Sequence, residues 1–322
     1  MTLSTPVALS VFDRPETTRR VFQAIRRARP RRLFVFADGS PSGDRAERCE
    51  RARAVAEQVD WPCEASYDYA DSNLGARDRY TTGVDWVFSQ VDDAIVLDDD
   101  CLPDPTFFPF CQAVLARYRD DPRVMMVCGT NYLQRWKSER QSFHFSLFGG
   151  VWGWASWKRA WELNDPAMEA WDVEGTKERV RALIADDQIY EFQARRFDRV
   201  RQDPDERHSW DLPWSLSRLA HAGLTVVPSA NLVRNLGNRR GRGLPRGHPL
   251  ADLRAHRMKE PISFPPDVRA DRAYDDLHVA RVMDWYGYED RHERLRLHPA
   301  VRKWGGRTLR AARHLRVGGA PG

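Results

Sequence analysis

Apolar and polar positions follow a regular pattern over the first 130 residues of the chain. Five short apolar segments, which begin 26 to 31 residues apart, predict β-strands: Pro6–Phe12, Arg32–Ala37, Cys63–Tyr67, Asp93–Leu97 and Val124–Cys128. Amphipathic stretches over residues 15–27, 44–59, 75–90 and 107–118 predict helices. Strands that alternate with helices at this spacing indicate an α/β fold with a mostly parallel sheet and flanking helices.

The pattern changes after residue 140. Strands are predicted over Phe143–Phe148 and Thr225–Pro228, and helices over residues 176–185, 189–201 and 210–221. Residues 149–157 are rich in glycine and tryptophan, and residues 235–249 form a Gly/Arg-rich loop. We therefore expect an α/β half over residues 1–140, a second half of the same domain over 141–250, and a helical C-terminal extension with a basic tail over 251–322.

Composition and charge indicate a folded protein without a nucleic-acid-binding core. Hydrophobic residues make up 42% and charged residues 30%, with both signs abundant. The net charge is +5, but residues 291–322 hold nine Arg or Lys against one Glu, so the rest of the chain carries a net −3. The basic balance is thus a property of the tail, which argues against nucleic acid as a partner.

The expected location is the cytoplasm. The first residues lack the basic start, long apolar stretch and cleavage site of a signal peptide, and no apolar run is long enough to span a membrane. The five cysteines are odd in number and form no C-x-x-C pair, which predicts reduced thiols. In the tail, basic residues from Arg302 to Arg316 interleave with Trp304, Leu309 and Leu315. This segment is either a peripheral contact with the anionic inner face of the membrane or a solvated terminus.

Polar residues follow the ends of the first four predicted strands. They are Asp13-Arg14-Pro15, Asp38-Gly39-Ser40, Ser72-Asn73-Leu74-Gly75 and Asp98-Asp99-Asp100. In sheets of this kind, ligands bind beyond the carboxyl ends of the strands. We therefore expect a phosphate-bearing ligand at this edge.

The three adjacent carboxylates Asp98, Asp99 and Asp100 are the strongest local signal. Their mutual repulsion raises at least one pKa, and a divalent cation would remove this cost. Mg²⁺ takes one or two protein carboxylates together with substrate phosphates, which suits a diphosphate ligand. On an extended backbone Asp98 and Asp100 would point one way and Asp99 the other. The alternative is a solvated acidic turn that caps the next helix, but the position after the fourth strand favours the metal site.

The other candidate residues each have a functional and a plain interpretation. Asp38 accepts from a nucleobase N–H or makes an Asp-Gly turn, and Arg14 contacts phosphate or pairs with a carboxylate such as Asp38. Asp211 is a general base for an acceptor hydroxyl or the N-cap of a helix. The tryptophans near Trp154 form a sugar pocket or pack in the core. His248 is a metal or phosphate contact or a solvated loop residue.

Taken in order, these positions resemble the GT-A class of glycosyltransferases, which has a Rossmann-like fold. Within it they look like relatives of N-acetylglucosaminyltransferase I and the bacterial family 2-like transferases. The resemblance covers about residues 5–250. It rests on five blocks, of which only the D-x-D block is characteristic alone: residues 13–17, residues 38–39, residues 97–101, residues 150–154, and Trp210-Asp211 with Trp214.

For the donor, the resemblance implies a nucleoside-diphosphate sugar, with UDP favoured. Arg14 would contact the diphosphate or hold Asp38, which would recognise the uracil edge. Gly75 and Arg77 would line the nucleotide, and residues 1–140 would form the nucleotide-sugar-binding half. Asp98 and Asp99 would face the ribose and the sugar.

For the chemistry, the resemblance implies a metal-dependent transfer with inversion at the anomeric carbon. Asp100 would bind Mn²⁺ or Mg²⁺, His248 would be a further metal ligand at the end of a loop that closes over the donor, and Trp154 would line the sugar pocket. Asp211, in the acceptor half, would be the catalytic base, and the acceptor would be a glycan, a lipid-linked or a small molecule of polysaccharide or glycoconjugate synthesis. The family often has a second carboxylate after this base, where this chain has Leu212.

Two other functions stay open at this point. A sugar nucleotidyltransferase, which makes nucleotide sugars, usually has a Gly-rich loop with Lys or Arg directly after the first strand, and the turn at Asp13-Arg14-Pro15 has no glycine. A non-catalytic nucleotide-sugar-binding protein would not need Asp211.

Overall fold

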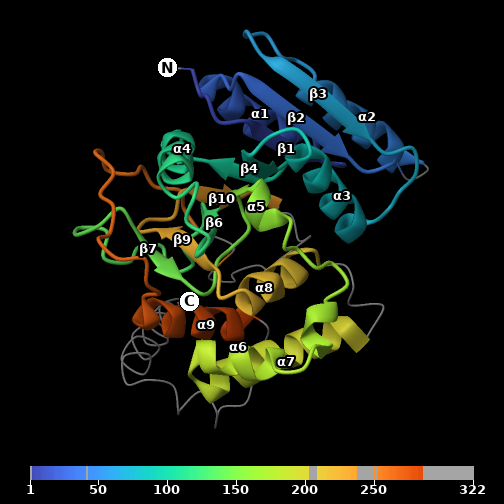
Figure 1. Ribbon diagram of the computed structural model, residues 1–322. Helices are drawn as coiled ribbons and strands as arrows, with labels where there is room; N and C mark the ends of the chain where they lie inside the picture. Colours follow the sequence, from blue (N-terminus) through green and yellow to red (C-terminus); the bar gives the residue numbers. More distant parts are fainter. Residues whose placement is uncertain (1, 41–42, 203–208, 238–249, 251–252, 286–322) are drawn as a thin grey trace, which may run out of the picture.

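The computed structural model describes residues 2–40, 43–202, 209–237, 250 and 253–285 of the chain. An eight-stranded sheet runs through these residues, with helices packed on both of its faces (Figure 1). In spatial order its strands are β3 (Glu64–Tyr69), β2 (Arg32–Ala37), β1 (Val7–Val11), β4 (Asp93–Asp98), β8 (Trp154–Trp157), β6 (Val124–Cys128), β9 (Leu224–Pro228) and β7 (Phe143–Ser146).

The first half of the sheet is parallel, as the spacing of apolar segments predicts. Strands β3, β2, β1 and β4 run in one direction, and Leu9 of β1 lies opposite both Val35 of β2 and Leu97 of β4. The five strands predicted over the first 130 residues are confirmed, with ends that differ by at most two residues. Strand β9 pairs parallel with β6, while β8 and the edge strand β7 are antiparallel to their neighbours.

Helices cover both faces because the sheet is apolar on both sides. Alternate residues of β1 face opposite ways: Val7 and Leu9 pack in the cluster that contains α1, α2 and α4, and Ala8 packs in the cluster that contains α3 and α5. The helices are α1 (Pro15–Ala28), α2 (Asp44–Ala56), α3 (Ala76–Phe88), α4 (Phe107–Arg117), α5 (Lys158–Trp161), the 3₁₀ helix η1 (Glu169–Asp172), α6 (Thr176–Ile184), α7 (Asp187–Gln202), α8 (Asp211–Ala220) and α9 (Arg272–Trp285).

Two features of the second half differ from the sequence-based expectation. The Gly/Trp-rich segment contains β8, which inserts between β4 and β6 in the middle of the sheet and is buried throughout. A second, two-stranded sheet joins β5 (Cys101–Pro103) to β10 (Val233–Asn235). Short strands that are buried on both faces lack the alternation that marks a half-exposed strand, so the pattern missed them.

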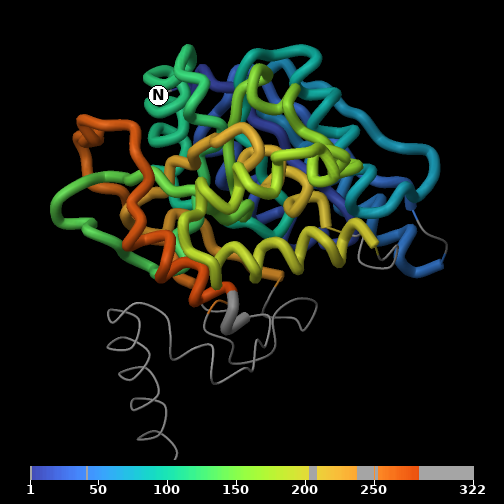
Figure 2. Tube along the Cα trace, turned by 60° about the horizontal axis from the view of Figure 1, so that its bottom comes forward, coloured from blue at the N-terminus to red at the C-terminus, as the bar shows by residue number. Residues whose placement is uncertain are grey.

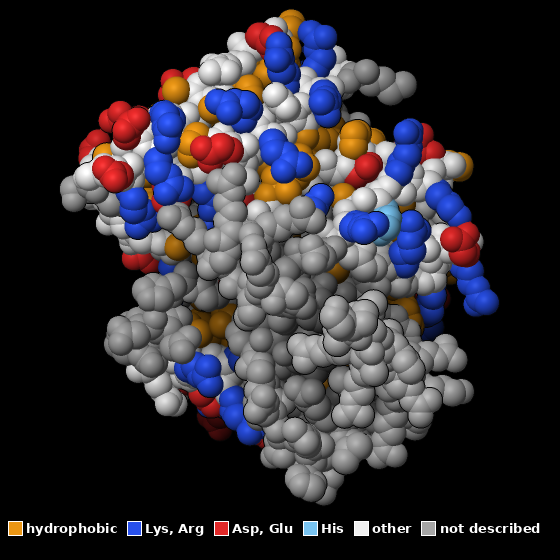
Figure 3. Space-filling view, turned by 180° about the vertical axis from the view of Figure 1, so that it is seen from behind, with side chains coloured by type: hydrophobic (Ala, Val, Ile, Leu, Met, Phe, Trp, Pro, Cys, Tyr) orange, Lys and Arg blue, Asp and Glu red, His pale blue; other side chains and the backbone are white. Residues whose placement is uncertain are grey.

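The cysteines form no disulfide, and the described surface carries both kinds of charge. All five cysteines are free, and four of them are buried. No described helix has the length and apolarity that a membrane crossing needs. Basic and acidic side chains are interspersed on the described surface of the face shown in Figure 3.

The segment of residues 253–271 passes along the β7 edge and leads into α9 (Figure 2). The Ser263 amide donates to the Ser142 hydroxyl at 2.9 Å, and the Asp271 amide donates to the Phe145 carbonyl at 2.8 Å. Asp275 of α9 is 2% exposed and accepts from the Ser146 hydroxyl of β7. Burial raises the pKa of this carboxyl to about 7 despite the hydrogen bonds from Ser146 and the Leu147 amide.

The raised pKa of Asp275 predicts a pH-dependent stability. The folded pKa of about 7 lies above the value of about 4 expected in the unfolded chain, so the contribution of this carboxyl is present at low pH and is lost as pH rises through 7. Asp275→Asn removes this titration. Between pH 5 and 8, the free energy of unfolding of the natural protein should fall by roughly 2–3 kcal/mol more than that of the variant, measured by chemical denaturation. Asp120 is exposed, so Asp120→Asn should show the same pH dependence as the natural protein. If the unfolding free energies of all three proteins change in parallel with pH, the raised pKa does not belong to Asp275.

Candidate functional site

The turn between β1 and α1 places Arg14 beside the end of β4. Pro15 opens α1, where its missing N–H has no partner to lose. The Arg14 carbonyl accepts from the Thr18 amide at 2.9 Å and from the Thr17 and Thr18 hydroxyls at 3.2 and 2.7 Å. The Arg14 backbone is therefore fixed, and because Ser10 of β1 lies opposite Asp98 of β4, its side chain can reach the acidic residues there.

The chain turns directly after β4, and this turn brings two carboxylates to one guanidinium. Asp99 accepts from the Phe12 amide at 3.0 Å and from Arg14 Nη1 at 3.2 Å. Asp100 accepts from the same Nη1 at 2.6 Å. The expected alternation of Asp99 and Asp100 is wrong, because residues 99 and 100 leave the extended conformation. The expected pairing of Arg14 with Asp38 is also not formed, since Arg14 is held by Asp99 and Asp100.

The acidic cluster carries more negative charge than Arg14 can balance. Asp99 and Asp100 are 4% and 7% exposed. Burial, followed by repulsion from the neighbouring carboxylates, raises the pKa of Asp98 to about 8 and that of Asp99 to about 7. Arg14 lowers both pKa values, but a single cation does not offset burial. Three carboxyl groups thus share one arginine, and a cation bound there would displace the protons that the raised pKa values keep on Asp98 and Asp99.

The short second sheet encloses the cluster from another side. The Leu236 amide, just after β10, donates to the Asp100 carbonyl at 2.7 Å. At Gly237 a Cβ would lie 2.2 Å from Asp100 Oδ2. Only glycine therefore allows the chain to lie against this carboxylate.

Asp38 forms the Asp-Gly turn that the sequence allows, and it also anchors the neighbouring loop. Its Oδ1 accepts from the amides of Gly39 at 2.9 Å and Leu74 at 2.8 Å, and Oδ2 accepts from the Gly75 amide at 3.0 Å. A Cβ at Gly39 would lie 2.1 Å from the Ser72 carbonyl carbon, so the two loops touch directly. A carboxylate has about four acceptor positions, so roughly one remains on Oδ2 for a ligand.

Two residues that were expected to contact the sugar donor, Arg77 and Trp154, are hydrogen-bonded within the protein instead. Arg77, near the start of α3, donates to the Pro166 carbonyl and so ties α3 to the segment before η1. Trp154 has no exposed surface, and its Nε1 donates to the Tyr80 hydroxyl at 2.9 Å. The expectation that Trp154 itself lines an open sugar pocket is therefore wrong, because β8 carries it into the middle of the sheet.

A stack of aromatic rings connects the acidic cluster to Asp211. Burial, and next the charge of Asp98, raise the pKa of the Tyr80 hydroxyl well above its usual value, so this hydroxyl lies close to the Asp98 carboxylate. The Tyr80 ring stacks on Trp210, with centroids 3.9 Å apart and planes at 11°. Asp211 is the next residue and the first of α8. Asp211 therefore directly follows the ring that stacks on Tyr80.

The N-cap position of α8 belongs to Trp210, and Asp211 is the first helical residue. Asp211 is half-buried and accepts from the Ser209 hydroxyl. Asp211 therefore has the partial exposure through which an acceptor hydroxyl could reach its carboxylate.

A divalent cation fits this site only together with a ligand. Within the described ranges, no three His, Cys, Asp or Glu side chains are placed to hold a metal ion by themselves. Mg²⁺ and its relatives take one or two carboxylates plus phosphate oxygens in nucleotide sites. The excess charge at Asp98–Asp100 and the glycine that leaves room beside Asp100 Oδ2 match such a two-carboxylate site. His248, the other expected ligand, lies outside the described residues.

Sequence reasoning missed Tyr80 and Gly237, and it named Trp210 without its stacking role. Tyr80 and Trp210 form the stack, and Gly237 borders Asp100. Trp210 stood beside a candidate base, but nothing in the sequence paired it with Tyr80, 130 residues earlier. Gly237 lay in a loop with several glycines, and only contact with Asp100 distinguishes it.

The structural similarity of this chain to the known proteins named here is low. No family model matches the chain, and no curated protein sequence does. A cytidylyltransferase from Leptospira borgpetersenii serovar Hardjo-bovis (strain JB197) matches with TM-score 0.32 and 10% identity, over 50% of this chain and 63% of that one. UDP-glucose pyrophosphorylase, solved in complex with UDP-glucose, matches with TM-score 0.26 and 9% identity, over 44% of this chain and 62% of that one. The chain therefore spans less than two thirds of either protein, and the resemblance to the GT-A class stays a prediction.

The contact between Gly237 and Asp100 predicts a specific loss of metal affinity. In Gly237→Ala the new methyl group would push the Asp100 carboxylate away from its position. We expect Mn²⁺, measured with a nucleoside diphosphate by titration calorimetry, to bind about 10–100-fold more weakly. Ala76→Ser, an exposed change at the start of α3, is a control that should leave the affinity unchanged. Equal metal affinity in Gly237→Ala and the natural protein would show that Asp100 takes no part.

Proposed function

We propose that this protein is a metal-dependent glycosyltransferase, which moves a sugar from a nucleoside-diphosphate donor to an acceptor hydroxyl with inversion. The arrangement that supports the proposal is the group of three carboxylates at the end of β4 together with the half-buried Asp211, which directly follows a tryptophan that stacks on Tyr80. The first group suits a diphosphate with its cation, and the second suits the removal of a proton from an acceptor.

The donor would lie along the carboxyl edge of β2, β1 and β4. The remaining acceptor position on Asp38 Oδ2 suits the imide N–H of uracil, which favours a UDP-sugar. Arg14, whose side chain is 31% exposed, would turn from Asp100 toward the diphosphate when a cation takes over the neutralisation of this carboxylate. Gly75 and Arg77 would border the nucleotide from the start of α3.

Asp98 and Asp99 would face the ribose and the sugar, and Asp100 would bind Mn²⁺ or Mg²⁺. When bound, the cation offsets the negative charge that develops on the leaving diphosphate. Asp211 would accept the proton of the acceptor hydroxyl while this oxygen attacks the anomeric carbon from the side opposite to the leaving group. A single displacement of this kind inverts the configuration at that carbon.

A sugar nucleotidyltransferase is the second candidate, and the two similar structures named above are enzymes that act on nucleotides. The β1–α1 turn argues against it. It has no glycine to cradle a triphosphate. The acceptor of the proposed transfer, whether glycan, lipid-linked or small molecule, would be set by the second half of the chain.

The proposal predicts a metal-dependent binding of the donor. A panel of nucleoside diphosphates and nucleotide sugars, with and without Mn²⁺, should raise the unfolding temperature for one NDP-sugar in the presence of the metal. At a hundredfold excess over the dissociation constant the stabilisation should be about 3 kcal/mol. Incubation with UTP or CTP and sugar 1-phosphates, followed by an assay for pyrophosphate, tests the second candidate. Release of pyrophosphate there, without transfer or hydrolysis of any NDP-sugar, would favour the nucleotidyltransferase.

Asp211→Asn separates chemistry from binding. Loss of a general base should lower kcat about 10²–10⁴-fold, while the metal-dependent thermal shift with the donor stays as in the natural protein. Asp187→Asn is the matched control, because Asp187 is also the first residue of a helix but is exposed and paired with Arg181. If Asp211→Asn keeps full activity, the assignment of the base is wrong. If it loses donor binding as well, Asp211 holds the site together instead.

A further inference from the structure

A second cavity lies at the opposite edge of the sheet from the acidic cluster. It has a volume of about 890 Å³ and is formed by the edge strand β7, the start of β9, the end of α6 and residues 265–272. Four strand spacings separate β7 from β4, which is a distance of about 19 Å. No residue of the candidate donor site lines this cavity, and its volume is in the usual range of ligand pockets, about 300–1,000 Å³.

The cavity has an apolar wall and an excess of cationic side chains. Phe145, Leu147, Leu183, Leu224, Pro265 and Pro266 supply the apolar part. Four cations, Arg123, Lys137, Arg269 and Arg272, face two carboxylates, Asp267 and Asp271. The lining therefore suits a molecule that is partly apolar and carries negative charge.

Two of these cations are already neutralised by carboxylates. Arg123 donates to both carboxylate oxygens of Asp121, at 2.9 and 2.7 Å. Lys137 lies 2.5 Å from Asp271 Oδ2, which also accepts from Trp136 Nε1 at 2.9 Å. These two positions shape the cavity without offering a free charge.

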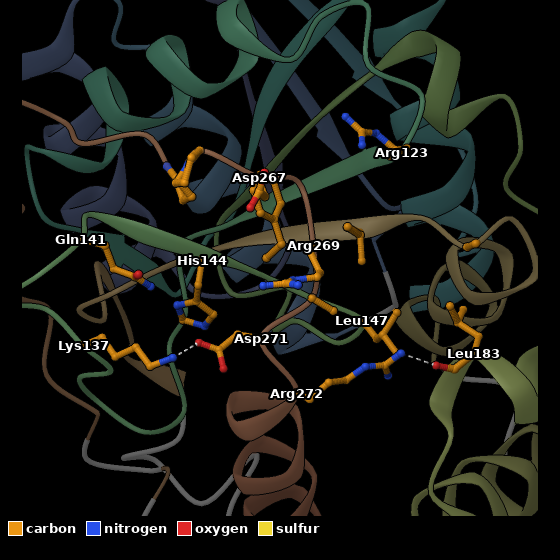
Figure 4. A pocket seen from close by; sticks show the side chains of 16 residues that line it. Arg123, Lys137, Gln141, His144, Leu147, Leu183, Asp267, Arg269, Asp271 and Arg272 are labelled. Carbon is orange, nitrogen blue, oxygen red and sulfur yellow. Dashed lines mark hydrogen bonds and ion pairs between the residues drawn. The ribbon is translucent and has the colours of Figure 1, made fainter.

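The other two cations form no ion pair in the described part of the chain, although the charge of Arg272 acts on the Asp275 carboxyl. Arg272 donates to the carbonyl oxygens of Leu183 at 2.7 Å and Ile184 at 3.2 Å, which are neutral acceptors. Arg269 is exposed, and no described residue accepts from its guanidinium. Asp267 lies on the same wall, but it forms no ion pair with Arg269. In Figure 4 the Arg269 side chain reaches across the cavity toward the side where His144 lies.

His144 is the second, independent sign of a missing partner. It sits on β7 with only 3% of its surface exposed, and neither ring nitrogen has a hydrogen-bond partner among the described residues. Burial lowers the pKa of His144 to about 3, so the ring is neutral and keeps one N–H donor. A buried imidazole without hydrogen-bond partners is unfavourable, so a ligand that supplies an acceptor would offset this penalty.

We propose that this cavity is a binding site for a small amphiphilic anion, with an apolar body against Leu147, Leu183 and Leu224 and a carboxylate or phosphate group between Arg269 and His144. The anionic group accepts from the guanidinium of Arg269 and, after a small shift of the ring, from the N–H of His144. The site is separate from the proposed donor site and does not depend on the proposed function.

Titration calorimetry with four small probes tests the chemistry of this site. The probes are hexyl phosphate, hexanoate, hexanol and inorganic phosphate. Hexyl phosphate or hexanoate should bind at least about tenfold more tightly than either of the other two probes. Hexanol lacks the charge, and inorganic phosphate lacks the apolar body. The anion that binds more tightly identifies the head group. No binding of either amphiphilic anion, or equal binding of hexanol, would overturn the proposal.

Two variants locate the binding. Arg269→Ala should weaken the binding of the amphiphilic anion about tenfold or more. Arg257 is an exposed arginine of the same segment that does not line the cavity, so Arg257→Ala should leave the affinity unchanged. His144→Phe should lower the affinity while the unfolding temperature stays equal or rises, because it removes two unpartnered polar atoms. Unchanged affinity in both Arg269→Ala and His144→Phe would overturn the proposal, even if a probe binds elsewhere.

Discussion

Much of this protein depends on one electrostatic constraint, the placement of three carboxylates against a single arginine. Coulombic repulsion between neighbouring carboxylates in a buried place is expensive unless a cation balances it. Arg14 supplies part of that balance, and it can do so only because β1 and β4 are adjacent parallel strands and because Pro15 starts α1 at once. The fold thus keeps three carboxyl groups beside one arginine, and the imbalance shows in the raised pKa values of Asp98 and Asp99.

The aromatic side chains connect this edge to the second half of the domain. Trp154, buried on β8, donates to Tyr80, and Tyr80 stacks on Trp210 at the start of α8. Trp214, one turn further along α8, contacts Trp154 and Trp161 with ring centroids 6.3 and 5.2 Å apart. A displacement of α8 would therefore disturb both the sheet and the Tyr80 ring. The abundance of tryptophan in this chain is explained first by this packing, and any contact with sugar would fall to the partly exposed Trp210.

The parts of the fold that the sequence predicts are those in which local pattern and packing agree. Strands β1, β2, β4 and β6 and helices α1 to α4 follow from apolar period and helix start signals, because each is amphipathic or bounded by polar residues. Strand β8 does not, since Trp154–Trp157 is buried on both faces and follows glycines that resemble a loop. For the site, the pattern predicts that Arg14, Asp38 and Asp98–Asp100 meet at one edge. It cannot predict that Arg14 pairs with Asp100 and not with Asp38, because that choice is made by a two-residue turn after β4.

The proton balance of the reaction favours a sugar transferase over a nucleotidyltransferase. When a nucleotide sugar is made, the attacking group is a phosphate oxygen of the sugar phosphate, which is already anionic at neutral pH and needs no base. When a sugar is transferred to a hydroxyl, the attacking oxygen must lose a proton, and a carboxylate placed beside it supplies the acceptor. Asp211 starts a helix, is half-buried and directly follows the ring that stacks on Tyr80. In the proposed sugar transfer this carboxylate would take the proton of the acceptor hydroxyl, whereas in nucleotidyl transfer it would keep only its structural place at the start of α8.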